Sequence, residues 1–112
     1  MAEITVFVVD PVRETITRKI IAGGSGAISR YVGGSWETDH SITAMFRGHA
    51  VAIRKNARHE DKPEGSWCFS SEDGALETIF HGVGVVYGIQ AARRTSAVVS
   101  EQDLLRSVHF LE

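Results

Sequence analysis

The segment of residues 42–56, ITAMFRGHAVAIRKN, constrains the fold most, because one strand register with alternating faces places nearly all of its apolar bulk on a single side. Such alternation is typical of β-strands, in which successive side chains point to opposite faces. A two-residue turn at Gly48 and His49 predicts a hairpin, since glycine in the first turn position suits a type II′ turn. The register gives three cross-strand pairs: Phe46 with Val51, Ala44 with Ile53, and Ile42 with Lys55.

The two faces of this predicted hairpin differ in chemistry. One face is apolar and is expected to join the core: Ile42, Ala44, Phe46, Val51 and Ile53. The other face is polar, small or cationic, with one methionine: Thr43, Met45, Arg47, Ala50, Ala52 and Arg54. Because small and apolar side chains on this face are typical of a partly covered surface, we expect it to contact a ligand or a second copy of the chain. We therefore also expect a homo-oligomer.

Length and charge narrow the class of protein. A chain of 112 residues with 43% apolar and 23% charged residues is typical of one globular domain. Its net charge of −2 argues against general nucleic-acid binding, which requires a basic face or tail.

Location is indicated by the N-terminus and by the cysteine content. The chain begins without the basic region of a signal peptide, and it holds no run of about 20 apolar residues, so we expect no membrane span. The single cysteine, Cys68, excludes an intramolecular disulfide and fits a reducing compartment. These features predict a cytoplasmic protein.

The residues before the hairpin predict two strands, a helix and a third strand. Residues 4–9 are almost wholly apolar, which predicts a central strand covered on both faces. A more polar strand over residues 14–21 is expected nearer the edge of the sheet. Ser25 is expected to cap a helix that ends at Gly33, and residues 35–38 predict a short strand.

After the hairpin, residues 55–66 are polar and densely charged, which predicts an exposed loop. Residues 67–69 are expected to return to the core. Ser70 and Asp73 then resemble a capping box, which predicts a helix ending at Gly82 with Leu76, Ile79 and Phe80 as its buried stripe.

The last third of the chain predicts two more strands and a helix before a closing strand. Residues 83–90 form a strand pattern whose glycine-bearing face allows a close approach to its backbone. Residues 96–99 predict a short strand, Ser100 a helix start, and residues 108–112 a final strand. The whole order predicts a single α+β domain over residues 1–112, a mostly antiparallel sheet with two or three short helices on one face.

Two glycine motifs and five histidines invite comparison with cofactor and metal sites. Gly23–Gly26 lacks the Lys-Ser/Thr pair of a phosphate loop, and Gly82-x-Gly84-x-x-x-Gly88 has no helix opening after it. The histidines lack metal-site spacing and are expected at the surface: His40, His49, His59, His81 and His109. We therefore predict no cofactor, no metal site and no catalytic residue.

A cationic group with two aromatic residues is the strongest candidate site. Arg47 and Arg54 share the non-core hairpin face, and Arg93 and Arg94 follow the glycine-bearing strand. Trp36 and Tyr87 are expected near them. Guanidinium groups beside an aromatic plate are typical of sites that bind phosphates, bases or acidic protein surfaces.

The chain resembles small families of unknown function encoded by bacteriophages and other mobile elements. Four segments carry the resemblance: Val9-Asp10-Pro11, Thr15-Ile16, Val32-Gly33-Gly34-x-x-Glu37 and Ile79-x-x-Gly82-x-Gly84-x-Val86-x-Gly88. Such families have no assigned activity, so the resemblance implies no site residue. It implies an accessory protein of a phage or plasmid that acts by binding.

We therefore expect a non-enzymatic binding protein. The resemblance implies a counter-defence factor that sequesters a phosphate-bearing signalling nucleotide or blocks a host defence protein. Two alternatives stay open. One is a small hydrolase or nuclease-like enzyme that uses His40, Asp39 or the Gly23–Gly26 turn, and the other is a structural assembly subunit without a ligand.

Overall fold

The computed structural model describes residues 3–22, 25–39, 49–54, 65–70, 76–90 and 93–111 of the chain. The strands in these ranges are β1 (Glu3–Asp10), β2 (Thr15–Ala22), β3 (Trp36–Asp39), β4 (His49–Arg54), β5 (Ser66–Ser70), β6 (Leu76–His81), β7 (Gly84–Gln90), β8 (Arg93–Thr95) and β9 (Val108–Leu111). Helix α1 (Ser25–Val32) follows β2, and helix α2 (Glu101–Ser107) precedes β9.

A six-stranded antiparallel sheet forms the centre of the fold. Its order is β2-β1-β7-β4-β3, and β8 pairs with β7 on the same edge as β1. Strand β1 is apolar on both faces because both are covered: Val6 and Val8 pack on one side, and Phe7 and Val9 on the other. The prediction of an inner first strand and an edge second strand is confirmed.

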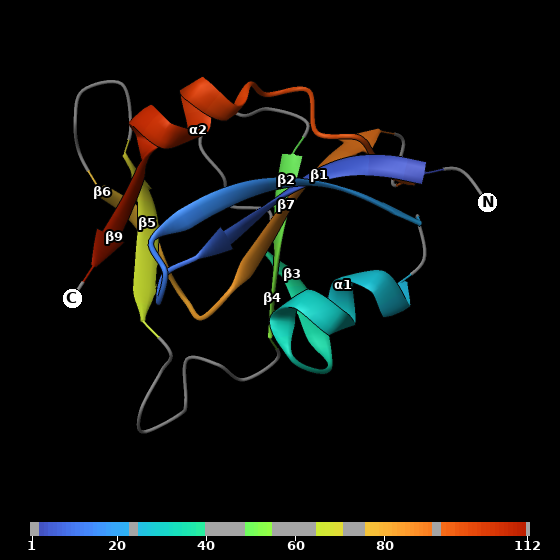
Figure 1. Ribbon diagram of the computed structural model, residues 1–112, viewed down its shortest axis with the longest axis horizontal. Coiled ribbons are helices and arrows are strands. Elements are labelled where there is room, and N and C mark those ends of the chain that lie inside the picture. Colours follow the sequence, from blue (N-terminus) through green and yellow to red (C-terminus); the bar gives the residue numbers. More distant parts are fainter. Residues whose placement is uncertain are drawn as a thin grey trace.

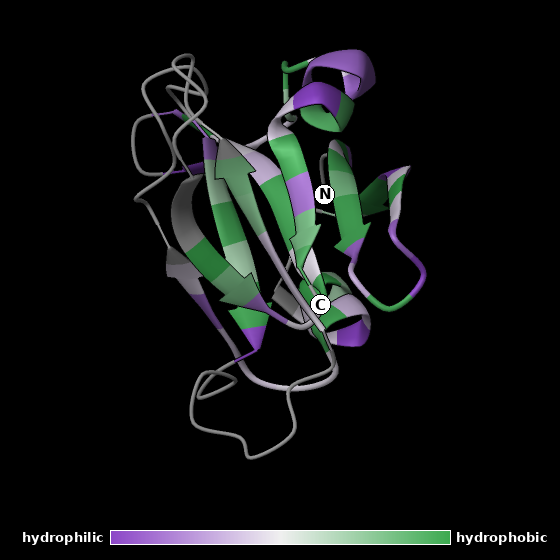
Figure 2. Cartoon of the chain, turned by 90° about the vertical axis from the view of Figure 1, so that its left-hand side faces the viewer, coloured by the Kyte–Doolittle hydropathy of each residue, from purple (hydrophilic) through white to green (hydrophobic). Residues whose placement is uncertain are grey.

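The two faces of the large sheet have different covers (Figure 1). On one face, the smaller sheet β6-β5-β9 and helix α2 enclose a core that includes Trp67, Phe80 and Leu104. On the other face, α1 contributes Ile28 and Val32 to a second core. Figure 2 shows that hydrophobic residues occupy much of the length of the strands. The α+β class is confirmed, but the helices predicted on one face lie on opposite faces of the sheet.

The predicted helix over residues 70–82 is wrong, because residues 76–81 form strand β6. Trp67 pairs with Phe80 and Cys68 pairs with Ile79 across the β5–β6 ladder. Phe80 is buried whereas its neighbour Ile79 is 47% exposed, which is the two-residue period of a strand. Residues 71–75, with most of the presumed capping box, lie outside the described residues.

The predicted hairpin register is also wrong. Both edges of β4 are paired, with β3 along residues 51–54 and β7 along residues 49–53. Val51 pairs with Asp39 on one side and with Val86 on the other, so the predicted pairing of Val51 with Phe46 cannot form. Alternation fixes the face to which a residue points, but it does not select the neighbouring strand. Residues 40–48, and residues 55–64 of the predicted loop, lie outside the described part of the chain.

The short strand predicted over residues 96–99 is displaced to Arg93–Thr95. After β8, the chain does not continue as a strand. Hydrogen bonds involving Ser96 and Ala97 hold it against Thr5 of β1. The Thr5 N–H donates to the Ser96 hydroxyl at 2.9 Å, and the Ala97 N–H donates to the Thr5 carbonyl at 2.8 Å. The Val98 N–H then donates to Nε2 of the buried His49 at 3.1 Å.

The predicted end of α1 at Gly33 and the predicted start of α2 at Ser100 are confirmed. Gly33, at φ +90°, closes α1 in a left-handed conformation, and its N–H donates to the Ser29 carbonyl at 2.9 Å. Ser100 caps α2, because its hydroxyl accepts from the Asp103 N–H at 3.1 Å. Neither helix in the described ranges has the length and apolarity needed to cross a membrane.

Candidate functional site

The face of β4 that was expected to meet a ligand or a partner is largely core. Ala50 and Ala52 are fully buried in the cluster that α1 covers, together with Val85 and Tyr87 of β7. Their small side chains therefore make room for α1 and for aromatic rings above the sheet. The chain covers this face itself, which removes the physical reason for expecting a second copy there.

Three predicted site residues come together where this face reaches the surface. Trp36 of β3 and Tyr87 of β7 lie edge to face, with ring centres 6.5 Å apart. The guanidinium carbon of Arg94, from β8, lies 5.4 Å from the centre of the Trp36 ring. This distance is within the range of a cation–π interaction, so residues from three strands form one assembly.

Tyr87 anchors this assembly from below. It is 2% exposed, and its hydroxyl is hydrogen-bonded to the Thr38 hydroxyl at 2.6 Å. Burial raises the pKa of Tyr87, while the Thr38 hydrogen bond and the positive charge of Arg94 oppose that rise. Tyr87 therefore serves as a neutral support for Trp36 and Arg94.

The other predicted arginines divide between the two faces. Arg54 is the cross-strand partner of Trp36, so both side chains leave the same face of the sheet. Arg94 is opposite Ile89, on the face of Tyr87, whereas Arg93 is opposite Gln90 and points to the other face. Arg47 lies outside the described residues. We call Trp36, Thr38, Arg54, Tyr87 and Arg94 the Trp36 cluster.

The Trp36 cluster offers one aromatic plate and two cations at the surface. Trp36 and Arg54 are half-buried, and Arg94 is exposed. A guanidinium group can donate two parallel hydrogen bonds to a phosphate or carboxylate, and an indole ring can stack against a base. The cluster is thus chemically suited to a planar anion.

Most of the groups named for the enzyme alternative lie outside the described residues, so this alternative stays a prediction. The Asp39 backbone pairs with Val51 in the sheet, and its side chain lies outside the described residues, as do His40, Gly23 and Gly24. Ser25 begins α1.

A different serine–histidine pair was missed by the sequence reasoning. Ser66 and His81 are cross-strand partners in β5 and β6, and the Ser66 hydroxyl is hydrogen-bonded to His81 Nδ1 at 2.9 Å. Such a contact is the first requirement of a nucleophile and its base. The signal that would have revealed it is the strand pattern of residues 76–81, which was interpreted as a helix.

The histidines and the cysteine do not form a metal centre among the described residues, where no three His, Cys, Asp or Glu side chains are grouped suitably. The prediction that the histidines lie at the surface is wrong for His49, which is 8% exposed. Cys68 is fully buried, and burial raises the pKa of its thiol.

No protein-family model, curated protein or solved structure matches this chain. The resemblance to families from bacteriophages and mobile elements therefore stays a prediction.

Proposed function

We propose that the chain is a non-enzymatic binding protein whose ligand is a small phosphate-bearing nucleotide. The observation that carries this proposal is the position of the Arg94 guanidinium, 5.4 Å from the centre of the half-buried Trp36 ring. A cation and an aromatic plate at the same place match the two unlike parts of a nucleotide, its phosphate and its base.

The roles within the site follow from the placement of each residue. Trp36 provides the plane on which the base stacks, and Arg94 and Arg54 provide the charge that binds phosphate oxygens. Tyr87 and Thr38 keep the Trp36 ring in place through the edge-to-face contact and their 2.6 Å hydrogen bond. Because these groups are held by four strands, little conformational entropy is lost on binding.

Binding without turnover would remove a nucleotide from solution and leave it chemically intact. That property fits the counter-defence role that the resemblance implies, in which a signalling nucleotide is sequestered. The alternative version, in which the chain blocks a host protein, uses the same cations against an acidic protein surface.

Tryptophan fluorescence tests the proposal directly. The chain has two tryptophans, and Trp67 is fully buried, so a bound base quenches mainly Trp36. Titration with a panel of linear and cyclic nucleotides is expected to give saturable quenching with at least one of them. The Arg94→Gln substitution should weaken that binding about ten-fold, because it removes a charge-assisted hydrogen bond.

Arg93→Gln is the matched control, since Arg93 is the preceding residue of β8 but points to the opposite face. It should leave the affinity unchanged. Absence of quenching with every nucleotide, or an equal loss in both variants, would contradict the proposal. Chromatography of the recovered nucleotide should show no product.

A second candidate function, hydrolysis of an ester or amide, rests on the 2.9 Å hydrogen bond between Ser66 and His81. In this mechanism His81 accepts the hydroxyl proton while the Ser66 oxygen attacks the carbonyl carbon, and the proton passes to the leaving group as the acyl-enzyme forms. Water then attacks the acyl carbon while His81 accepts its proton, and that proton returns to the Ser66 oxygen as the acid is released. Labelling by a fluorophosphonate that is lost in Ser66→Ala would support it. Absence of labelling in the folded protein would exclude this route.

A further inference from the structure

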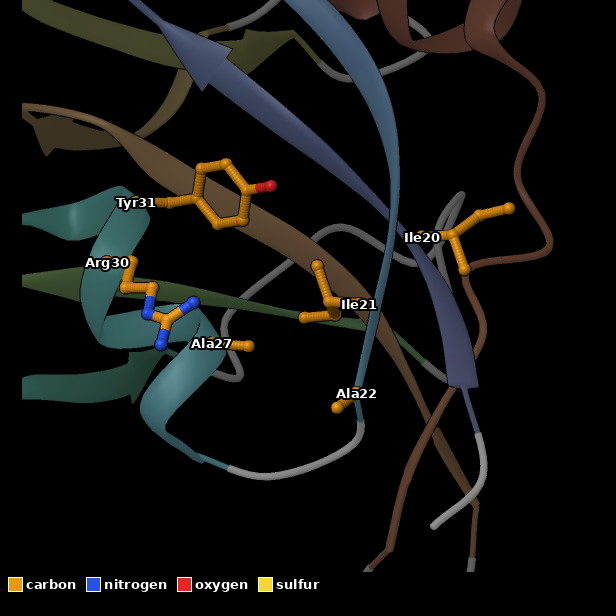
Figure 3. A pocket seen from close by; sticks show the side chains of 6 residues that line it. All are labelled: Ile20, Ile21, Ala22, Ala27, Arg30 and Tyr31. Carbon is orange, nitrogen blue, oxygen red and sulfur yellow. The ribbon is translucent and has the colours of Figure 1, made fainter.

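A hollow of about 430 Å³ lies between α1 and the last residues of β2. Its walls are formed by Ile20, Ile21, Ala22, Ala27, Arg30 and Tyr31. Figure 3 shows Tyr31 extending from α1 toward β2 and Ile21 pointing back toward α1, whereas Ile20 points away from the helix. The volume lies within the range of about 300 to 1,000 Å³ that is usual for small-molecule sites.

The lining of this hollow is amphipathic. Ile21 is 7% exposed and, with the half-buried Ala27, provides an apolar floor. Tyr31 provides a hydroxyl and Arg30, which is exposed, a guanidinium group. Among the described residues, no carboxylate forms an ion pair with Arg30. An apolar floor with a few polar groups at one side is the usual composition of a site for a small ligand.

We propose that this hollow binds a small amphipathic carboxylate, with its alkyl or aryl body against Ile21 and Ala27 and its head group on Arg30. The guanidinium fork of Arg30 matches the two oxygens of a carboxylate. The body displaces water from apolar surface, which supplies the remaining affinity.

The charge of the site selects a carboxylate over a phosphate. Among the described residues that line the hollow, Arg30 is the single charged one, so one negative charge is neutralised there. A phosphate monoester carries close to two negative charges at neutral pH and would leave one of them unpaired. The Trp36 cluster, with Arg54 and Arg94, is the better phosphate site.

The carboxylate site does not depend on the nucleotide site. None of its lining residues belongs to the Trp36 cluster, although both sites border the core that α1 covers. Either site can therefore fail while the other is retained.

Calorimetric titration with octanoate and with octanol tests the proposal, because the two compounds share an eight-carbon chain and differ in charge. Octanoate is expected to bind more tightly than octanol. Arg30→Gln should weaken octanoate about ten-fold and leave octanol unchanged, because it removes the charge and keeps the apolar floor. Ala27→Leu should weaken both, because its larger side chain fills the hollow.

Arg18→Gln is the matched control, since Arg18 is an exposed cation of β2 that does not line the hollow. It should change neither affinity. Absence of octanoate binding, or binding that is equal in the wild-type and Arg30→Gln proteins, would overturn the proposal. Circular dichroism of each variant confirms that it is folded, and Trp36→Phe should leave octanoate binding intact.

Discussion

At the scale of single residues, Gly84 sets how closely the two sheets approach each other. A β-carbon at this position would overlap the ring of Trp67, which is fully buried, and would lie 3.2 Å from the Val51 side chain. Glycine is thus needed here for space and not for an unusual φ. The sequence pattern predicted such an approach at the glycine-bearing face of this strand.

Gly84→Ala is expected to destabilise the protein by about 1 to 3 kcal/mol, because the Trp67 ring has no free volume into which to move. Chemical denaturation measures this change. Gly26→Ala is the control, since nothing lies within 4 Å of a β-carbon built there and the residue belongs to α1. It should be neutral or stabilise by up to about 1 kcal/mol. Equal destabilisation by both substitutions would contradict the packing argument.

Residue types predicted part of the candidate site and no more. The proximity of Trp36 and Tyr87 to an arginine was expected and is confirmed by the edge-to-face contact and the Arg94 distance. The pairing of Arg93 with Arg94 as one site was wrong, because adjacent strand residues point to opposite faces. The pairing register of β7 and β8 shows which of the two arginines lies on the same face as Trp36, and that residue is Arg94.

At the scale of elements, β6 shows where local sequence patterns fail. Residues 76–81 have apolar positions that fit a helical stripe, yet they pair with β5 because Phe80 and Trp67 gain a contact with ring centres 4.7 Å apart. Packing between the paired strands overrides a local capping signal. The Ser66–His81 pair depends on this same ladder, so it was hidden by the same error.

Helix α2 is the element whose local signal was sufficient. Ser100→Ala is expected to cost about 1 kcal/mol of stability, because it removes the acceptor of the Asp103 N–H. Ser100→Asp restores an acceptor and should recover most of that loss. Chemical denaturation of the three proteins checks the expectation, and equal stability of wild type and Ser100→Ala would show that the cap is not needed.

At the scale of the whole molecule, the burial of two ionisable side chains, Cys68 in the smaller sheet and Tyr87 in the large sheet, gives a pH dependence. Burial raises the pKa of Cys68 and of Tyr87, so each group stays protonated to a higher pH in the folded chain than in the unfolded chain. Their contribution to stability is complete below their ordinary pKa values of about 8.5 and 10. This contribution to stability is lost as the pH rises through the pKa values that the two groups have in the folded chain.

Stability should therefore fall with increasing pH in the alkaline range, and the fall above about pH 10 should be shallower in Tyr87→Phe. Denaturant titrations at a series of pH values measure both slopes. If the two proteins showed the same alkaline slope, Tyr87 would not be the group responsible.

The burial of both sheet faces also explains why a surface site was hard to locate from the sequence. The alternation in residues 50–54 correctly separated Val51 and Ile53 from Ala50, Ala52 and Arg54. It gave no sign that α1 would cover the second face, since cover depends on chain topology. Among the described residues of that face, Trp36, Arg54 and Arg94 of the Trp36 cluster lie at its rim and reach the surface.

The most direct test of nucleotide binding at this rim is an NMR titration of the isotope-labelled protein with the tightest-binding nucleotide of the panel. The largest amide shifts are expected at residues 36–38, 52–54, 87–89 and 94, which surround the Trp36 cluster. Shifts centred on residues 20–31, or on Ser66 and His81, would place the ligand elsewhere. Such a result, or the absence of shifts, would contradict the proposed function.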